Sequence, residues 1–158
     1  MTVKSEIDYF LQQHCPCMTA HELYSPMQLD YASRKGAHVL TGATSIQHLK
    51  NLQKLRVTVG VPLLINHGRF KLRGFRHFLE QLQLLQQDIT HSEMSTHVLM
   101  MGTDCTFDGL STTVFWERYK DKECLNAFNG RGLYNTFMHL DSRNLINGRK
   151  RFWDFRSK

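Results

Sequence analysis

The strongest constraint on the fold of this 158-residue chain is the spacing of its apolar residues, which changes along the sequence. From Ile46 to Leu55 an apolar residue stands at every third position, so these side chains share one face of a helix, which ends at Gly60. A short apolar run of strand length follows at 61–65. A second helical pattern, from Phe75 to Ile89, predicts an amphipathic helix that packs on a sheet.

The rest of the chain adds strand patterns to these helices. Residues 98–101 are expected to form a buried strand, and 114–128 a helix that stops at the glycine-rich segment 129–132. Phe137 to Asp141 alternates with period two, which places His139 and Asp141 on one face of a strand. Helices mixed with few, short, separated strands predict an α+β fold.

Composition points to one globular domain over residues 1–158 that binds an anionic partner. Hydrophobic residues make up 41% and charged residues 22%, and the formal charge is +6. No apolar run approaches the ~20 residues of a membrane span, and Met1 to Leu11 lacks a signal-peptide core. We therefore expect synthesis in the cytosol. The four cysteines are expected to be reduced thiols: Cys15, Cys17, Cys105 and Cys124.

Three residues have the chemistry of a hydrolytic metal site. His97 is followed seven residues later by Asp104, and His139 stands on the strand that also carries Asp141. Two imidazoles and one carboxylate give zinc three protein ligands and leave a fourth position for water. A zinc site at His14, Cys15, Cys17 and His21 is disfavoured, because the cysteine spacing is too short and no second pair follows.

The order of several short motifs resembles a known peptidase family. These motifs are Asn66-His67-Gly68-Arg69, Ser95-Thr96-His97 leading to Asp104, Gly130-Arg131-Gly132-Leu133-Tyr134, and Phe137-Met138-His139-Leu140-Asp141-Ser142-Arg143. They are similar to those of the zinc D-alanyl-D-alanine carboxypeptidases and L-alanyl-D-glutamate endopeptidases. In that family the first motif is Ser-Gly-Tyr-Arg. The resemblance covers residues 43–155 and matches the N-terminal extension, 1–42, only loosely.

The resemblance implies both a fold and an activity. The fold is that of the Hedgehog and DD-peptidase domains, with a small central antiparallel sheet flanked by helices. By resemblance, His97, Asp104 and His139 bind Zn²⁺. Arg69 holds the substrate's carboxylate or polarises the scissile carbonyl. Asp141 shares a strand face with His139, so it is placed to accept a hydrogen bond from a ligand imidazole or an arginine, and the alternative is a solvated strand end. The substrate is the stem peptide of peptidoglycan.

The chain departs from the family at two positions that bear on chemistry. Met100 stands where relatives have glycine, three residues after the first histidine. Thr136 stands where many relatives have the general base, and a hydroxyl cannot take a proton from water at neutral pH. The substitutes near the motifs are His67, Glu93 and Asp108.

Three functions follow from these observations. The first is a zinc peptidase of the phage endolysin type, made in the cytosol and acting on the cell wall after release. The second is a zinc-binding interaction module of the same fold without activity. The third and weakest is nucleic-acid binding through the basic, aromatic tail 148–158, which carries no accompanying nucleic-acid signature. Nothing in the pattern predicts an oligomeric state.

Overall fold

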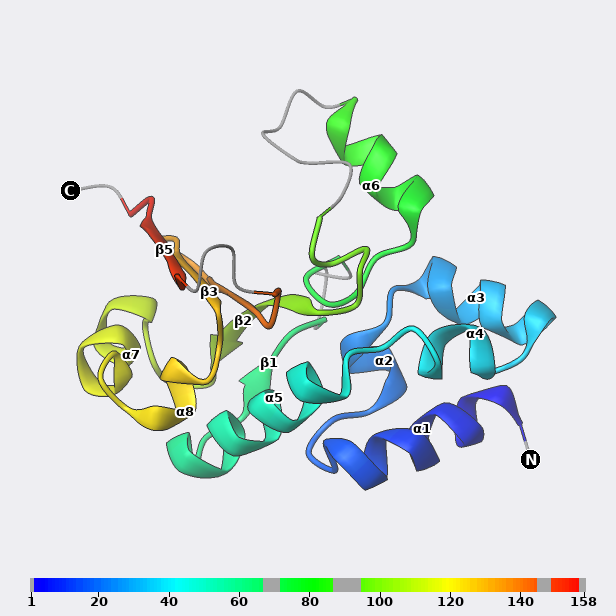
Figure 1. The fold of residues 1–158 in the computed structure, drawn as a ribbon, viewed down its shortest axis with the longest axis horizontal. Helices are drawn as coiled ribbons and strands as arrows, with labels where there is room; N and C mark the ends of the chain where they lie inside the picture. Colours follow the sequence, from blue (N-terminus) through cyan, green and yellow to red (C-terminus); the bar gives the residue numbers. More distant parts are fainter. Residues whose placement is uncertain (1, 67–71, 87–94, 145–148, 157–158) are drawn as a thin grey trace.

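The fold of the chain is given by a computed structural model that describes residues 2–66, 72–86, 95–144 and 149–156. Figure 1 shows helices on two sides of a small sheet. The helices are α1 (Val3–His14), α2 (Ala20–Leu23), α3 (Pro26–Lys35), α4 (His38–Thr41), α5 (Ile46–Val59), α6 (Phe78–Leu85), α7 (Thr112–Tyr119) and α8 (Glu123–Asn126). The strands are β1 (Leu63–Leu64), β2 (Gly102–Phe107), β3 (Gly130–Leu133), β4 (Met138–Asp141) and β5 (Arg151–Asp154).

The predicted α+β class is confirmed, but the expectation of a purely antiparallel sheet is wrong. The strand order is β1-β2-β4-β3-β5. Neighbours from β1 to β3 pair antiparallel, whereas β5 pairs parallel with β3. Both sides of β4 are occupied, by β2 and β3, so β5 pairs with the other side of β3, where it runs parallel and makes the sheet mixed. Among the described residues, no helix is long and apolar enough to cross a bilayer.

Helix α5 forms where the three-residue spacing predicts it. The Ser45 hydroxyl accepts a hydrogen bond from the backbone N–H of His48 and caps the first turn. Gly60 ends the helix with a φ of 75°, in the left-handed region that glycine adopts without strain. Leu52 is fully buried, but Ile46, at the first turn, is 43% exposed. The apolar face is therefore one turn shorter than the sequence pattern suggests.

Strand β2 begins four residues later than predicted. Residues 96–100 form a turn, in which the N–H groups of Val98 and Leu99 both donate to Ser95 O. Met100 has a φ of 50°, so the chain cannot be extended there and the strand starts only at Gly102. The predicted run 61–65 is likewise reduced to the two residues of β1.

Helix α6 does not pack on the sheet as expected. It begins at Phe78, while Phe75 lies outside it in an isolated bridge to Tyr24, and Ile89 lies outside the described residues. Leu79 is 53% exposed. The buried side of this helix is polar, since Glu80 Oε2 accepts a hydrogen bond from Ser25 Oγ at 2.5 Å. In Figure 1 the helix stands at the margin of the molecule.

The predicted helix over 114–128 is divided into α7 and α8. The break occurs because Lys122 is extended, with φ −82° and ψ 145°, and caps the start of α8. The glycine-rich segment 129–132 is not only a stop, since β3 begins within it. The tail contributes β5, and its Phe152 ring stacks on Trp116 with centroids 4.8 Å apart.

The burial pattern of α5 predicts two different mutational costs. Leu52→Ala should lower the free energy of unfolding by about 2–5 kcal/mol, because it leaves a cavity in the core. Ile46→Ala, the matched control on the same helix, should change it by about 0.5 kcal/mol or less. Urea unfolding of both variants measures the difference, and equal losses would contradict the assignment of the buried face.

Candidate metal centre

Three predicted residues meet in one buried group, His97, Asp104 and His139, whose ligand atoms all lie within 4.8 Å of one another. Asp104 on β2 and His139 on β4 are direct partners across the antiparallel pair. His97 belongs to the turn that precedes β2. A group of this composition can hold a metal ion.

The backbone fixes the orientation of His97. Its Nδ1 lies 2.7 Å from Gly74 O, and a carbonyl only accepts, so Nδ1 carries the proton and donates. Nε2 is then the atom with the free electron pair. It points to His139 Nδ1 at 3.2 Å and to Asp104 Oδ1 at 3.3 Å. The Nε2 atom of His97 is therefore available to bind a cation.

His139 is oriented by carboxylates on both sides of its ring. Nε2 lies 3.1 Å from Asp141 Oδ2, and Nδ1 lies 2.8 Å from Asp104 Oδ1. Burial disfavours the charged ring, but the hydrogen bonds to these two carboxylates outweigh it and raise the pKa of His139 to about 8. A bound metal ion would displace the proton of Nδ1, the atom that faces His97 and Asp104, while Nε2 keeps its donation to Asp141, so Nδ1 would be the ligand nitrogen.

Asp104 shares its two oxygens between two partners. Oδ1 faces the imidazoles, whereas Oδ2 lies 3.4 Å from Arg76 Nη2. Burial acts to raise the pKa of Asp104, but the nearby imidazoles His97 and His139 hold it well below its usual range. Asp104 is thus an ionised carboxylate inside the protein, able to serve as an oxygen ligand.

Asp141 is the residue behind His139, and its side chain is 0% exposed. Its Oδ1 accepts from Arg143 Nε at 2.8 Å, and Oδ2 accepts from Arg143 Nη2 as well as from His139. Burial opposes ionisation, but these donors hold the pKa of Asp141 well below its usual range. Space for the carboxylate exists because Gly130 has no side chain, since a Cβ there would lie 2.2 Å from Asp141 Oδ2.

The segment 72–76 packs directly on the group, and the sequence analysis did not assign it a role. Arg73 O accepts from Asp104 N at 2.6 Å, and Arg76 N donates to His97 O at 3.2 Å. The signal was present in the sequence, because Arg73-Gly74-Phe75-Arg76 has a glycine, an aromatic ring and an arginine in the order of Ser-Gly-Tyr-Arg. The structure brings Arg76 to the group, whereas Arg69, the arginine that the resemblance indicates, lies outside the described residues.

The other predicted site residues are not among the described residues of this group. Arg69, His67 and Glu93 lie outside the described residues. Asp108 is exposed in the turn that follows β2, four residues past Asp104 and about 13 Å along the strand direction. The structure therefore does not bring Asp108 beside the group.

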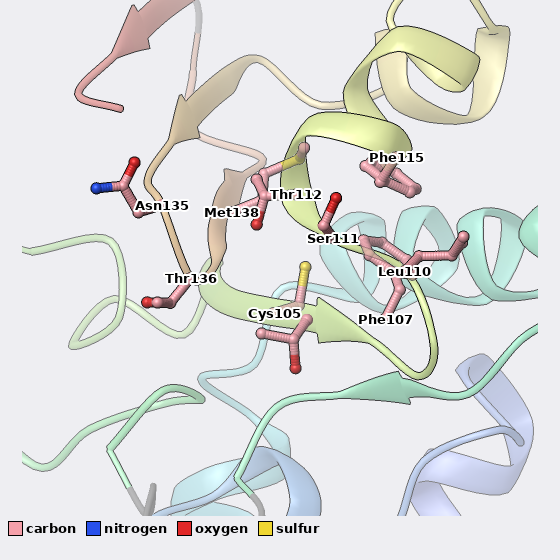
Figure 2. A pocket seen from close by; sticks show the side chains of 10 residues that line it. Cys105, Phe107, Leu110, Ser111, Thr112, Phe115, Asn135, Thr136 and Met138 are labelled. Atoms are coloured by element: carbon pink, nitrogen blue, oxygen red, sulfur yellow. The ribbon is translucent and has the colours of Figure 1, made fainter. Parts of the chain in front are cut away.

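Thr136 lines a pocket of about 250 Å³ with Cys105 and Met138 (Figure 2). Cys105 and Met138 each stand next to a residue of the metal-binding group on their strands, so they point to the opposite face of the sheet. Phe107, Leu110 and Phe115 supply most of the remaining apolar wall. Thr136 thus belongs to the rim of a pocket behind the sheet.

Comparison with family models, with curated proteins and with solved structures gives no match for this chain. The geometry of the group and the sequence motifs are therefore the basis for assigning a function.

A polar network lies beneath the group and centres on His48 of α5. Its two ring nitrogens contact Ser142 Oγ and Thr103 Oγ1, each at 3.2 Å. Asn51 Nδ2 donates to the same Ser142 oxygen at 3.1 Å. Thr103 precedes Asp104 in the sequence, and Ser142 follows Asp141, so this network ties α5 to both strands. Burial lowers the pKa of His48 to about 3.

Because His48 is neutral when folded, it makes stability depend on pH. In the unfolded chain its pKa returns to about 6.5, so below that pH unfolding takes up one proton at this site. Between about pH 6 and pH 4 this adds about 1.4 kcal/mol per pH unit to the loss of stability on acidification. Urea unfolding at several pH values should show that the free energy of unfolding falls more steeply with acidification in wild type than in His48→Gln. Parallel curves would contradict a neutral, buried His48.

Proposed function

We propose that this chain is a zinc metallopeptidase that hydrolyses amide bonds in peptidoglycan stem peptides. The observation that carries the proposal is the convergence of His97, Asp104 and His139, whose ligand atoms all lie within 4.8 Å of one another. The motif resemblance supplies the reaction and the substrate class.

The donor set favours zinc over other common cations. Calcium and magnesium prefer oxygen ligands, whereas two imidazole nitrogens and one carboxylate oxygen suit zinc. Zinc held by His97, Asp104 and His139 supplies Lewis acidity and an activated water, which is the chemistry that amide hydrolysis requires. Each of the three residues is buried, so the ion would be held by the protein at a site of low dielectric.

The turn before β2 gives the resemblance physical support. Met100 stands where relatives have glycine, and its φ of 50° lies in the region that glycine adopts at little cost. The backbone at Met100 thus has a conformation that favours glycine, the residue that relatives have at this position. The same turn delivers His97 and leads the chain into Asp104.

Two arginines have separate roles in this proposal. Arg76 is a positioning residue: it binds Asp104 Oδ2 and, through Nη1, Gln81 Oε1 at 3.2 Å, so its donors are engaged by the protein itself. It holds Asp104 with Oδ1 toward the imidazoles. Arg69 has the role of binding the substrate carboxylate or the scissile carbonyl oxygen.

The metal proposal predicts one equivalent of zinc per chain. His97→Ala should lose stoichiometric zinc, because two protein ligands hold the ion far more weakly than three. His21→Ala is the matched control, since His21 is exposed on α2 and should keep the full equivalent. Elemental analysis after dialysis against dilute zinc measures both. A full equivalent in His97→Ala would exclude this ligand set.

The peptidase proposal predicts that a residue near the motifs acts as the general base in place of Thr136. His67→Ala and Glu93→Gln are the test variants, and Asp108→Ala is the control because Asp108 lies past the end of β2. One test variant should keep its zinc and lose at least about 100-fold in hydrolysis of purified peptidoglycan, while the control stays near wild type. Amine release and muropeptide chromatography measure the reaction.

The position of Thr136 favours one alternative, a zinc-binding interaction module without activity. Thr136 lies at a pocket on the face of the sheet opposite to His97, Asp104 and His139, and its hydroxyl cannot replace the acidic side chain of a general base. Under this alternative the wild type binds a full equivalent of zinc but cleaves neither peptidoglycan nor isolated muropeptides. That outcome would exclude the peptidase proposal while leaving the metal centre in place.

A further inference from the structure

Two thiols lie side by side at the end of α1, far in sequence from the metal-binding group. Cys15 Sγ and Cys17 Sγ are 3.6 Å apart and share a hydrogen bond. Both are free, and Pro16 separates them in a tight turn. The turn is held at both ends, because Cys15 N donates to Leu11 O at 2.6 Å and Cys17 N donates to Gln53 Oε1 at 3.1 Å. The backbone thus keeps the two sulfur atoms together.

The two thiols have different surroundings. Cys15 is fully buried, whereas Cys17 is partly exposed. The hydrogen bond from the Cys15 thiol lowers the pKa of Cys17, and the charge of Arg56 acts in the same direction. The same hydrogen bond together with burial raises the pKa of Cys15. Cys17 is therefore suited to attack a disulfide that reaches the surface, and the buried Cys15 is placed to attack Cys17 in a second step.

We infer that Cys15 and Cys17 form a reversible dithiol site that exchanges with small-molecule disulfides. The Cys17 thiolate attacks one sulfur of the external disulfide, forms a mixed disulfide and releases one thiolate. That thiolate takes the proton of Cys15 and leaves as a thiol. The Cys15 thiolate then attacks Cys17 Sγ and releases the second external thiolate, which takes from solvent the proton that Cys17 lost when it ionised. In total, two protein thiols and one external disulfide give one Cys15–Cys17 disulfide and two external thiols.

The proposed disulfide is an exchange site and not a structural staple. A bridge between residues 15 and 17 closes a three-residue loop, and such a short loop removes little entropy from the unfolded chain. The fold is also held without it, since both thiols are free in the structure. Partly exposed disulfides with little stabilising effect are reduced readily, which makes the reaction reversible.

The experiment uses the full reduced chain, zinc-loaded, with glutathione disulfide as the probe, and reads intact mass and disulfide position by mass spectrometry. Wild type should lose two hydrogens and show a link between residues 15 and 17, which excess reduced glutathione removes. Cys15→Ser and Cys15→Ala should stop at one glutathione on Cys17. Cys17→Ser should react at least about tenfold more slowly than wild type.

Cys124→Ser is the matched control, because Cys124 is buried and belongs to another part of the fold. It should form the 15–17 link at the wild-type rate. The inference is overturned if wild type keeps four free thiols in excess glutathione disulfide, if glutathione persists on Cys17 in wild type, or if the link joins other cysteines. Circular dichroism of each variant before oxidation identifies any that has not folded, and two Cys15 substitutions guard against such a loss.

Discussion

The register between β2 and β4 is the constraint on which the group of His97, Asp104 and His139 depends. Asp104 lies opposite His139, and Gly102 lies opposite Asp141. A slip of one residue would move Asp104 to the face of the sheet that Cys105 now occupies, because side chains alternate along a strand. Burial of Met138 and Leu140 on that other face opposes such a slip. The core thus fixes the pairing, and the pairing fixes the group.

The sheet alone does not complete the arrangement, since the third ligand needs a second support. Gly74 supplies it by accepting the Nδ1 proton of His97, and Gly74 is itself held by Asn66 Oδ1 at 2.8 Å from its N–H. A side chain could not fit at this position, because a Cβ would lie 2.1 Å from Leu23 O. A backbone contact between distant segments therefore decides which nitrogen of His97 can meet a cation.

Periodic segments were predictable from the sequence, and segments set by distant contacts were not. The spacing in α5 and the alternation in β4 gave the correct elements, and the motif order indicated His97, Asp104 and His139, which the structure brings together. The start of β2 was missed because the left-handed Met100 delays it. The packing of α6 was missed because its buried side chain, Glu80, is polar and bonds to Ser25. Arg76 was missed because Asn66-His67-Gly68-Arg69, which precedes it, also ends in glycine and arginine and was matched to Ser-Gly-Tyr-Arg in its place.

The burial of Asp141 explains why a carboxylate stands behind His139. An ionised group with no exposed side chain is costly unless donors surround it, and here Arg143 and His139 provide them. A neutral amide could put its single oxygen between His139 and Arg143 Nη2, but its NH₂ group would then face Arg143 Nε, another donor. Only the carboxylate accepts all three hydrogen bonds, so its charge orients the imidazole while the arginine compensates that charge. Gly130 then follows as a requirement, since only a residue without Cβ leaves room for this carboxylate beneath β3.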